Sequence, residues 1–215
     1  CQFKNIIMRN KILLLIIFVL SVTANAASQT FPVDTAKLNT SFRELVSSPN
    51  TIERQKAFFE AFPNTWTEFM MTYQYNSENN YDLTMYNLAQ KQIEALGGRV
   101  TLIKDSIYCK KLVNIAVGGE LEADAPNYYQ TLLHKTMWHR MDGMLEAIFK
   151  LRKGHQMQFW QFYWSNPVKS KQIETEYNRL LKLNIDAYPE EMKTMKIAFE
   201  YFYDGVNIDG GFSKE

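Results

Sequence analysis

The chain has 215 residues, of which 24 are basic and 23 acidic, so its formal net charge at pH 7 is +1. Nucleic-acid-binding proteins usually carry a clear basic excess, and this balance argues against that class. Hydrophobic residues make up 46% of the chain and aromatic residues 14%, which is enough to bury the core of one domain without disulfides or metals.

The chain begins with the order of segments that is typical of a secretory signal peptide. A basic segment at residues 8–11, an apolar segment at 12–20 and the small-residue motif Ala-Asn-Ala at 24–26 follow one another. A membrane-spanning helix needs roughly 20 apolar residues, which makes an uncleaved anchor the weaker interpretation. We therefore predict a signal peptide at residues 8–26. Residues 1–7, which precede the first methionine, are interpreted as translated upstream sequence.

Cleavage after Ala26 would leave residues 27–215 as a single all-helical domain. It would remove three basic residues and no acid, which changes the net charge to about −2. Cys109 would be the remaining thiol, and apolar neighbours at helical spacing predict that it is buried and inert. No cysteine follows the apolar segment to accept a lipid. The sequence thus predicts a soluble protein exported through the inner membrane, periplasmic or extracellular, with no stable membrane anchor after cleavage.

Proline and glycine fall almost entirely between the periodic segments of the chain, as is typical of helix starts and ends. Apolar residues within the segments recur at helical spacing, and no segment alternates as a strand does. The sequence therefore predicts an all-α fold, an irregular bundle of eight or nine helices. The expected helices lie at residues 35–46, 51–62, 65–73, 82–96, 102–117, 127–152, 156–164, 168–183 and 190–203. The run at 127–152 is one long helix or two that meet near Gly143, and the helix at 82–96 is expected to end at Gly97-Gly98.

The histidines are candidates for metal binding or acid–base chemistry. His139, Asp142 and Glu146 would share one face of a continuous helix, where they could hold a divalent metal with further ligands from elsewhere. The same residues suit a solvated helix surface, on which Glu146 would pair with Lys150. A tight ligand signature such as H-E-x-x-H is absent. We therefore expect neither a metal site nor a cofactor.

Glu120, Glu122 and Asp124 are candidates for a catalytic acid, because they lie in a segment bounded by glycine and proline. Exported helical proteins include peptidoglycan lyases that use a single acid, but the motif around such a glutamate is absent. In the alternative interpretation Asp124 or Asn127 caps the following helix, and the two glutamates face water. Nucleophile motifs such as G-x-S-x-G and phosphate-binding loops are also absent. The sequence leaves enzymatic activity open and favours a protein without it.

Residues 159–164, Phe-Trp-Gln-Phe-Tyr-Trp, place five large rings within six positions. One helix cannot direct all five into one core, so some are expected to reach a second surface, on a neighbouring helix or on a partner. Because Trp and Tyr are enriched at binding hot spots, Trp160, Tyr163 and Trp164 are candidate anchors for a protein partner, with the two glutamates above as further candidates. Ordinary cores are also rich in aromatic residues, which is the structural alternative.

A longer segment carries a family resemblance. Residues 54–69, Arg-Gln-Lys-Ala-Phe-Phe-Glu-Ala-Phe-Pro-Asn-Thr-Trp-Thr-Glu-Phe, followed by Tyr-Gln-Tyr at 73–75, resemble a motif of small exported helical proteins. Some proteins of that kind are coded beside secreted antibacterial toxins and act as periplasmic immunity proteins. The resemblance implies a toxin-neutralising binding protein, and it carries over no functional residue. A helix–turn–helix around Phe62-Pro63-Asn64 also accounts for the segment.

Three classes of function follow from these observations. The first is an exported binding protein, in its specific form an immunity protein that neutralises a secreted antibacterial toxin by covering its surface. The second is an enzyme acting on the cell wall or on glycans, and the third is a structural assembly factor of the envelope. The first class predicts a protein partner and no nucleic acid.

Overall fold

The computed structural model describes residues 33–47, 50–75, 83–166 and 170–204, with the backbone alone for 202–204. The chain divides into two units, Cys1–Phe31 and Pro32–Glu215. The first unit, which contains the predicted signal peptide, lies outside the described residues. The described residues all belong to the second unit.

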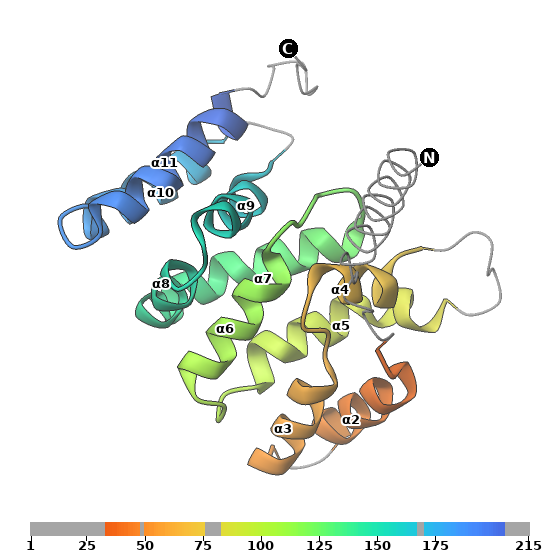
Figure 1. Cartoon of the computed structure of the whole chain (residues 1–215). Coiled ribbons are helices and arrows are strands. Elements are labelled where there is room, and N and C mark those ends of the chain that lie inside the picture. The colour runs from red at the N-terminus through yellow and green to blue at the C-terminus, as the bar shows by residue number, and fades with distance from the viewer. Residues whose placement is uncertain (1–32, 48–49, 76–82, 167–169, 205–215) are drawn as a thin grey trace, which may run out of the picture. The chain divides into compact units, whose positions relative to one another are not determined.

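The described part of the chain is all-α, as the sequence predicts, with ten helices and no strand (Figure 1). The helices are α2 Thr35–Ser47, α3 Ile52–Ala61, α4 Trp66–Tyr73, α5 Thr84–Arg99, α6 Asp105–Ala116, α7 Asp124–His139, α8 Met141–Phe149, α9 Lys153–Trp164, α10 Lys171–Asn184 and α11 Pro189–Asp204. None of these helices is both long enough and apolar enough to span a bilayer.

Several helix boundaries differ by three residues from those expected, since α6 begins at Asp105, α7 at Asp124, α9 at Lys153 and α10 at Lys171. Two further differences lie at glycines. α5 does not end at Gly97-Gly98 but continues to Arg99. The run at 127–152 is divided at Arg140, where φ of −139° and ψ of 44° end α7. Of the two alternatives, two helices are therefore correct, but they meet at Arg140, three residues before Gly143, and this division accounts for the tenth helix.

Gly143 instead lies inside α8, at the contact between α8 and α6. A Cβ atom at this position would lie 3.0 Å from Cys109 Sγ, which is tighter than an ordinary contact. The absence of a side chain lets the two helices approach closely. A glycine inside a helix here serves packing and does not end the helix.

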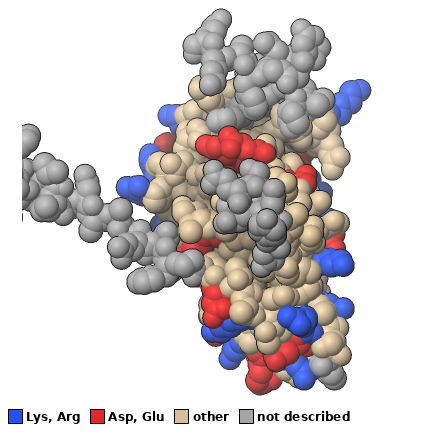
Figure 2. All heavy atoms as spheres, turned by 90° about the vertical axis from the view of Figure 1, so that its right-hand side faces the viewer, with Lys and Arg blue, Asp and Glu red and all other residues tan. Residues whose placement is uncertain are grey.

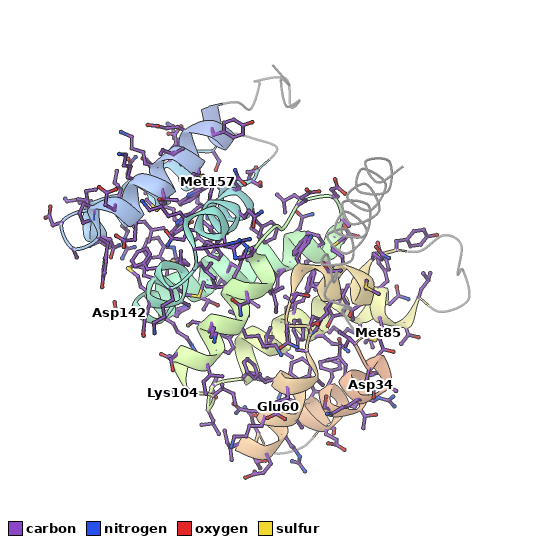
Figure 3. The ribbon with its side chains drawn as sticks, viewed as in Figure 1. Asp34, Glu60, Met85, Lys104, Asp142 and Met157 are labelled. Atoms are coloured by element: carbon purple, nitrogen blue, oxygen red, sulfur yellow. The ribbon has the colours of Figure 1, made fainter. Side chains whose placement is uncertain are left out.

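Apart from α2 and α3, the helices that share the most extensive contacts are not consecutive in the chain. The most extensive contacts join α9 to α11, α6 to α8, α2 to α3 and α5 to α7. Side chains fill the spaces between these ribbons (Figure 3). Aromatic rings link the pairs, because the ring centroid of Phe69 on α4 lies 5.0 Å from that of Tyr129 on α7. Trp66 on α4 likewise lies 4.9 Å from Phe162 on α9. The hydrophobic core is continuous across the unit.

The segment at 54–75, which carries the family resemblance, forms α3, a turn and α4. Thr65 caps α4 by accepting a hydrogen bond from the backbone N–H of Glu68 at 3.2 Å. The four aromatic side chains of the segment with no exposed surface are Phe58, Phe62, Phe69 and Tyr73. These positions of the segment therefore build the core.

Two buried glutamines hold the chain where helices end. Gln55 Oε1 on α3 accepts hydrogen bonds from the backbone N–H groups of Thr101 and Leu102, each at 2.7 Å. Gln130 Nε2 on α7 donates to carbonyl groups at the end of α9, including that of Ser165 at 2.6 Å. Because buried polar groups are costly when unpaired, these contacts fix the segments that follow α5 and α9.

Candidate binding groove between α5 and α7

The candidate anchors Trp160, Tyr163 and Trp164 lie on α9 and are at most 1% exposed, so they offer no surface to a partner in this structure. The second surface that the aromatic segment reaches is a neighbouring helix. Trp164 packs edge-on against Phe199 of α11, with 5.3 Å between centroids, while Phe162 faces α4. α9 thus uses its rings on two sides, to hold α11 and to join the core.

Tyr163 also takes part in a polar contact among three helices. Its hydroxyl donates to Glu176 Oε1 of α10, and His134 Nδ1 of α7 lies 2.8 Å from the same oxygen. Burial and the Glu176 carboxylate raise the pKa of Tyr163 well above its ordinary value. The phenol therefore stays protonated and donates at all physiological pH values. This contact ties α10 to α7 and α9.

The glutamates proposed as candidate acids, Glu120 and Glu122, are exposed in the segment between α6 and α7. Neither residue lines the groove described below. The expected capping of α7 by Asp124 or Asn127 is wrong, because the residue before the helix makes no side-chain cap. Asp124 Oδ2 instead accepts a hydrogen bond from Tyr86 of α5 at 2.8 Å.

The candidate metal ligands do not share one helix face. The break at Arg140 places His139 on α7, whereas Asp142, labelled in Figure 3, and Glu146 lie on α8. Glu146 pairs with Lys150 at 2.5 Å, as the solvated interpretation predicts. In the described part of the chain, no group of three or more His, Cys, Asp or Glu side chains is placed to hold a metal ion.

Cys109 is fully buried on α6, which confirms the prediction for this residue. Burial raises the pKa of the thiol from 9.0 to about 11. Because the thiolate is the reactive form, the buried and protonated thiol is a poor nucleophile. Cys109 therefore serves packing in this structure.

A groove of about 580 Å³ lies between α5 and α7. One face of α5, from Gln90 to Gly98, forms one wall, and one face of α7, from Tyr128 to His139, forms the other. The floor includes the buried side chains of Ile93 and Leu132. This volume falls in the range of ordinary ligand-binding sites.

The two walls run in the same direction. Near the start of α5, Tyr86 donates to Asp124 at the start of α7. Beyond the ends of both helices, Arg140 Nη2 donates to the carbonyl oxygen of Val100 at 3.4 Å. Asn50 Nδ2 also donates to the carbonyl oxygen of Arg99 at 2.9 Å. The carboxyl ends of α5 and α7 are thus held side by side at one end of the groove.

Two glycines shape that end of the groove. A Cβ atom on Gly97 would lie 2.5 Å from Leu132 Cδ1, so this glycine permits the close approach of α5 and α7. A Cβ atom on Gly98 would meet nothing within 4 Å. Gly98 therefore leaves the backbone of α5 open where it borders both the groove and a recess between α2 and α5. Glycine inside a helix costs up to about 1 kcal/mol relative to alanine.

Two cationic side chains, Lys135 and Arg140, lie at the same end, together with the imidazole of His139. Lys135 and His139 make no ion pair or hydrogen bond with other described residues. Arg140 Nη1 lies 3.0 Å from Asp105 Oδ1 without the alignment of a hydrogen bond, and its guanidinium stacks over the ring of Tyr108. On the face shown in Figure 2, by contrast, acidic and basic side chains are interspersed.

The groove has the chemistry of a binding site. Its cations, hydroxyls and aromatic rings can hold a ligand, but the lining contains no serine or cysteine nucleophile and no metal site. Sequence reasoning missed the groove, because its walls are separated in the chain and each wall alone resembles an ordinary helix face. The Gly97-Gly98 pair was the available signal, and it was interpreted as a helix end.

Comparison with family models, with curated proteins and with solved structures finds no match to this chain.

Proposed function

We propose that this chain is an exported binding protein without catalytic activity, which neutralises a protein partner by covering part of its surface. The groove between α5 and α7 carries this proposal. It combines Lys135 and His139, which have no partner among the described residues, with an apolar floor. Convergent polar groups over an apolar floor are typical of binding sites.

The surrounding structure supports binding over catalysis. Trp160, Trp164 and other large aromatic side chains are packed in the core, and the buried thiol of Cys109 is protonated at neutral pH. The glutamates considered for glycan cleavage, Glu120 and Glu122, are exposed and lie outside the groove. A rigid aromatic core can hold the groove in one shape, which lowers the entropy lost on binding.

The specific form that we propose is an immunity protein against a secreted antibacterial toxin. The resemblance of residues 54–75 to exported immunity proteins supports it, and in this structure that segment provides core packing. The predicted signal peptide at residues 8–26 would place the protein in the periplasm or outside the cell. A toxin delivered between cells would meet it there.

The experiment is a toxicity and binding assay. Deletion of the gene is expected to make cells sensitive to a toxin coded by an adjacent gene, and the purified chain is expected to form a stable complex with that toxin. Lys135→Glu should weaken the complex, whereas Lys193→Glu, on α11 and outside the groove, should leave it unchanged. An adjacent gene that codes for no toxin, together with deletion cells that stay resistant, would contradict the proposal.

The alternatives give different results in the same cells. An enzyme acting on the cell wall would turn over peptidoglycan and lose that activity in Glu120→Gln or Glu122→Gln. An envelope assembly factor would copurify with a constant envelope component, and its deletion would change the envelope without any toxin.

A further inference from the structure

We infer that the groove between α5 and α7 binds an extended acidic peptide segment, whose carboxylate lies at the end formed by Gly98, Lys135 and His139. This inference rests on the proposed function, because it names the part of a protein partner that the groove would take. The length, the charge and the open backbone of the groove support it.

The length of the groove suits a peptide. Its wall on α7 extends from Tyr128 to His139, which is about 17 Å at 1.5 Å per residue. An extended chain rises about 3.3 Å per residue, so roughly five residues fit along this seam. A ligand the size of a single amino acid would fill one end and leave the rest of the apolar floor uncovered.

The charge of the groove selects an acid. Lys135 is exposed on α7, and His139 lies one turn further on the same face. Arg140 adds a second cation, although Asp105 at 3.0 Å offsets part of its charge. Glu94 supplies the opposing charge on α5, where its Oε1 accepts a hydrogen bond from Gln90 at 2.9 Å. The excess of positive charge therefore lies on the α7 wall.

The helix ends themselves act against an anion, because the carboxyl end of a helix carries about half a negative charge. This opposition is reduced here. The carbonyl oxygens of Arg99 and Val100 already accept hydrogen bonds from Asn50 and Arg140. The unpaired ammonium group of Lys135 is then the main source of attraction for a carboxylate.

Gly98 gives the ligand its closest approach to the protein. Gly97 is accounted for by its contact with Leu132, but no contact within the described residues accounts for Gly98. A main chain laid against α5 at this point would meet backbone and no side chain. Filling the position should therefore block a peptide while leaving the packing of the protein unchanged.

The test uses the full chain and a fluorescein-labelled pentaglutamate peptide, with fluorescence anisotropy as the readout. We expect saturable binding that weakens with added salt, and no comparable binding of pentaglutamine. Lys135→Glu replaces one attraction by one repulsion and should lower the affinity about tenfold or more. Glu94→Gln removes the opposing charge and should raise the affinity.

Two glycine variants form a matched pair. Gly98→Leu places a side chain in the groove and should abolish binding. Gly154→Leu, near the start of α9, also adds a side chain where a Cβ atom meets nothing within 4 Å, and should bind as the wild type does. Thermal unfolding of both variants checks that each is folded.

Several results would overturn the inference. Equal binding of pentaglutamine, no binding of pentaglutamate, or full binding by Gly98→Leu would each do so. Displacement of the peptide by free glutamate at equal carboxylate concentration would assign the groove to a small acid. A toxin complex that Gly98→Leu leaves intact would refute the groove inference alone, whereas peptide binding without any toxin partner would refute the proposed function alone.

Discussion

The buried lysine of α6 gives a quantitative test of the structure. Lys111 is only 8% exposed, its ammonium group donates to the carbonyl oxygen of Phe59 at the end of α3, and it lies 4.7 Å from the centroid of the Phe59 ring. Burial lowers its pKa from 10.5 to about 8, and nearby Glu68 and Glu60, which is labelled in Figure 3, oppose this shift in part. As the pH rises, the native protein should therefore lose the proton of Lys111 at a lower pH than the unfolded chain does.

The sign of the effect follows from proton counting. Between pH 8 and pH 10.5 the unfolded chain binds more protons at Lys111 than the native protein, so the free energy of unfolding rises with pH. From pH 7 to pH 9 the rise is about 1.3 kcal/mol at 1.36 kcal/mol per pKa unit. Cys109, whose pKa is raised from 9.0 to about 11, acts in the opposite direction. Its effect over that range is about 0.4 kcal/mol, which leaves a net rise of about 1 kcal/mol.

The assay is urea unfolding at pH 7, 8 and 9, followed by tryptophan fluorescence. Lys111→Met should remove the rise and leave a small decrease with pH. The control is Lys110→Met, because Lys110 is the exposed neighbour on the same helix, and both lysines line a recess between α3 and α6. Lys111→Met also leaves the Phe59 carbonyl without its donor, so the change with pH is the readout and the absolute stability is not. A wild-type rise that persists in Lys111→Met would refute the reasoning.

Four further predictions concern the two glycines of α5, the contact at Glu176 and the burial of Cys109. Gly97→Ala should leave the protein less stable than Gly98→Ala does, because its Cβ atom would lie 2.5 Å from Leu132 Cδ1 and that side chain must shift. Gly98→Ala should stabilise the protein by up to about 1 kcal/mol in thermal unfolding. Glu176→Gln, which weakens the acceptor shared by a histidine and a tyrosine, should cost about 1–2 kcal/mol in urea unfolding, and an unchanged midpoint would contradict that role. With Cys1 changed to Ser, Cys109 should react with a thiol reagent only as fast as the native protein opens, and rapid labelling would show that it is accessible.

Most helices could be predicted from the sequence, because local chemistry determines their ends. The expected helices at 35–46 and 65–73 agree with Thr35–Ser47 and Trp66–Tyr73 within one residue. For α4, Thr65 supplies the N-cap, and Pro63 prevents the preceding helix α3 from continuing into it. Signals of this kind lie within a few residues of the boundary that they set.

The two boundaries that were expected at glycines depend on contacts between helices. Gly97 and Gly143 each lie where another helix approaches too closely for a Cβ atom, so glycine is needed inside the helix. Nothing in the neighbouring sequence distinguishes such a glycine from one that ends a helix. The break at Arg140 is also tertiary in character, because its side chain reaches the chain beyond α5 and the ring of Tyr108.

The candidate sites also differ in whether the neighbouring sequence or contacts between helices determine them. The aromatic residues at 159–164 were conspicuous in the sequence, and their density reflects a helix that packs on two sides, toward α4 and toward α11. The groove had no conspicuous motif, because its cations, its floor and its glycines come from two helices far apart in the chain. A sequence pattern does not show which residues from distant helices come together in the fold.

Gly98 is the position at which the fold and the proposed function can be separated. A helical glycine that permits a close contact, such as Gly97, contributes to packing and offsets its own cost. Gly98 makes no such contact with the described residues, so its cost of up to about 1 kcal/mol is not offset within the protein. If Gly98→Ala stabilises the protein and Gly98→Leu abolishes peptide binding, the open backbone is there for a ligand. If both variants bind the peptide normally, the open space at Gly98 does not contribute to binding.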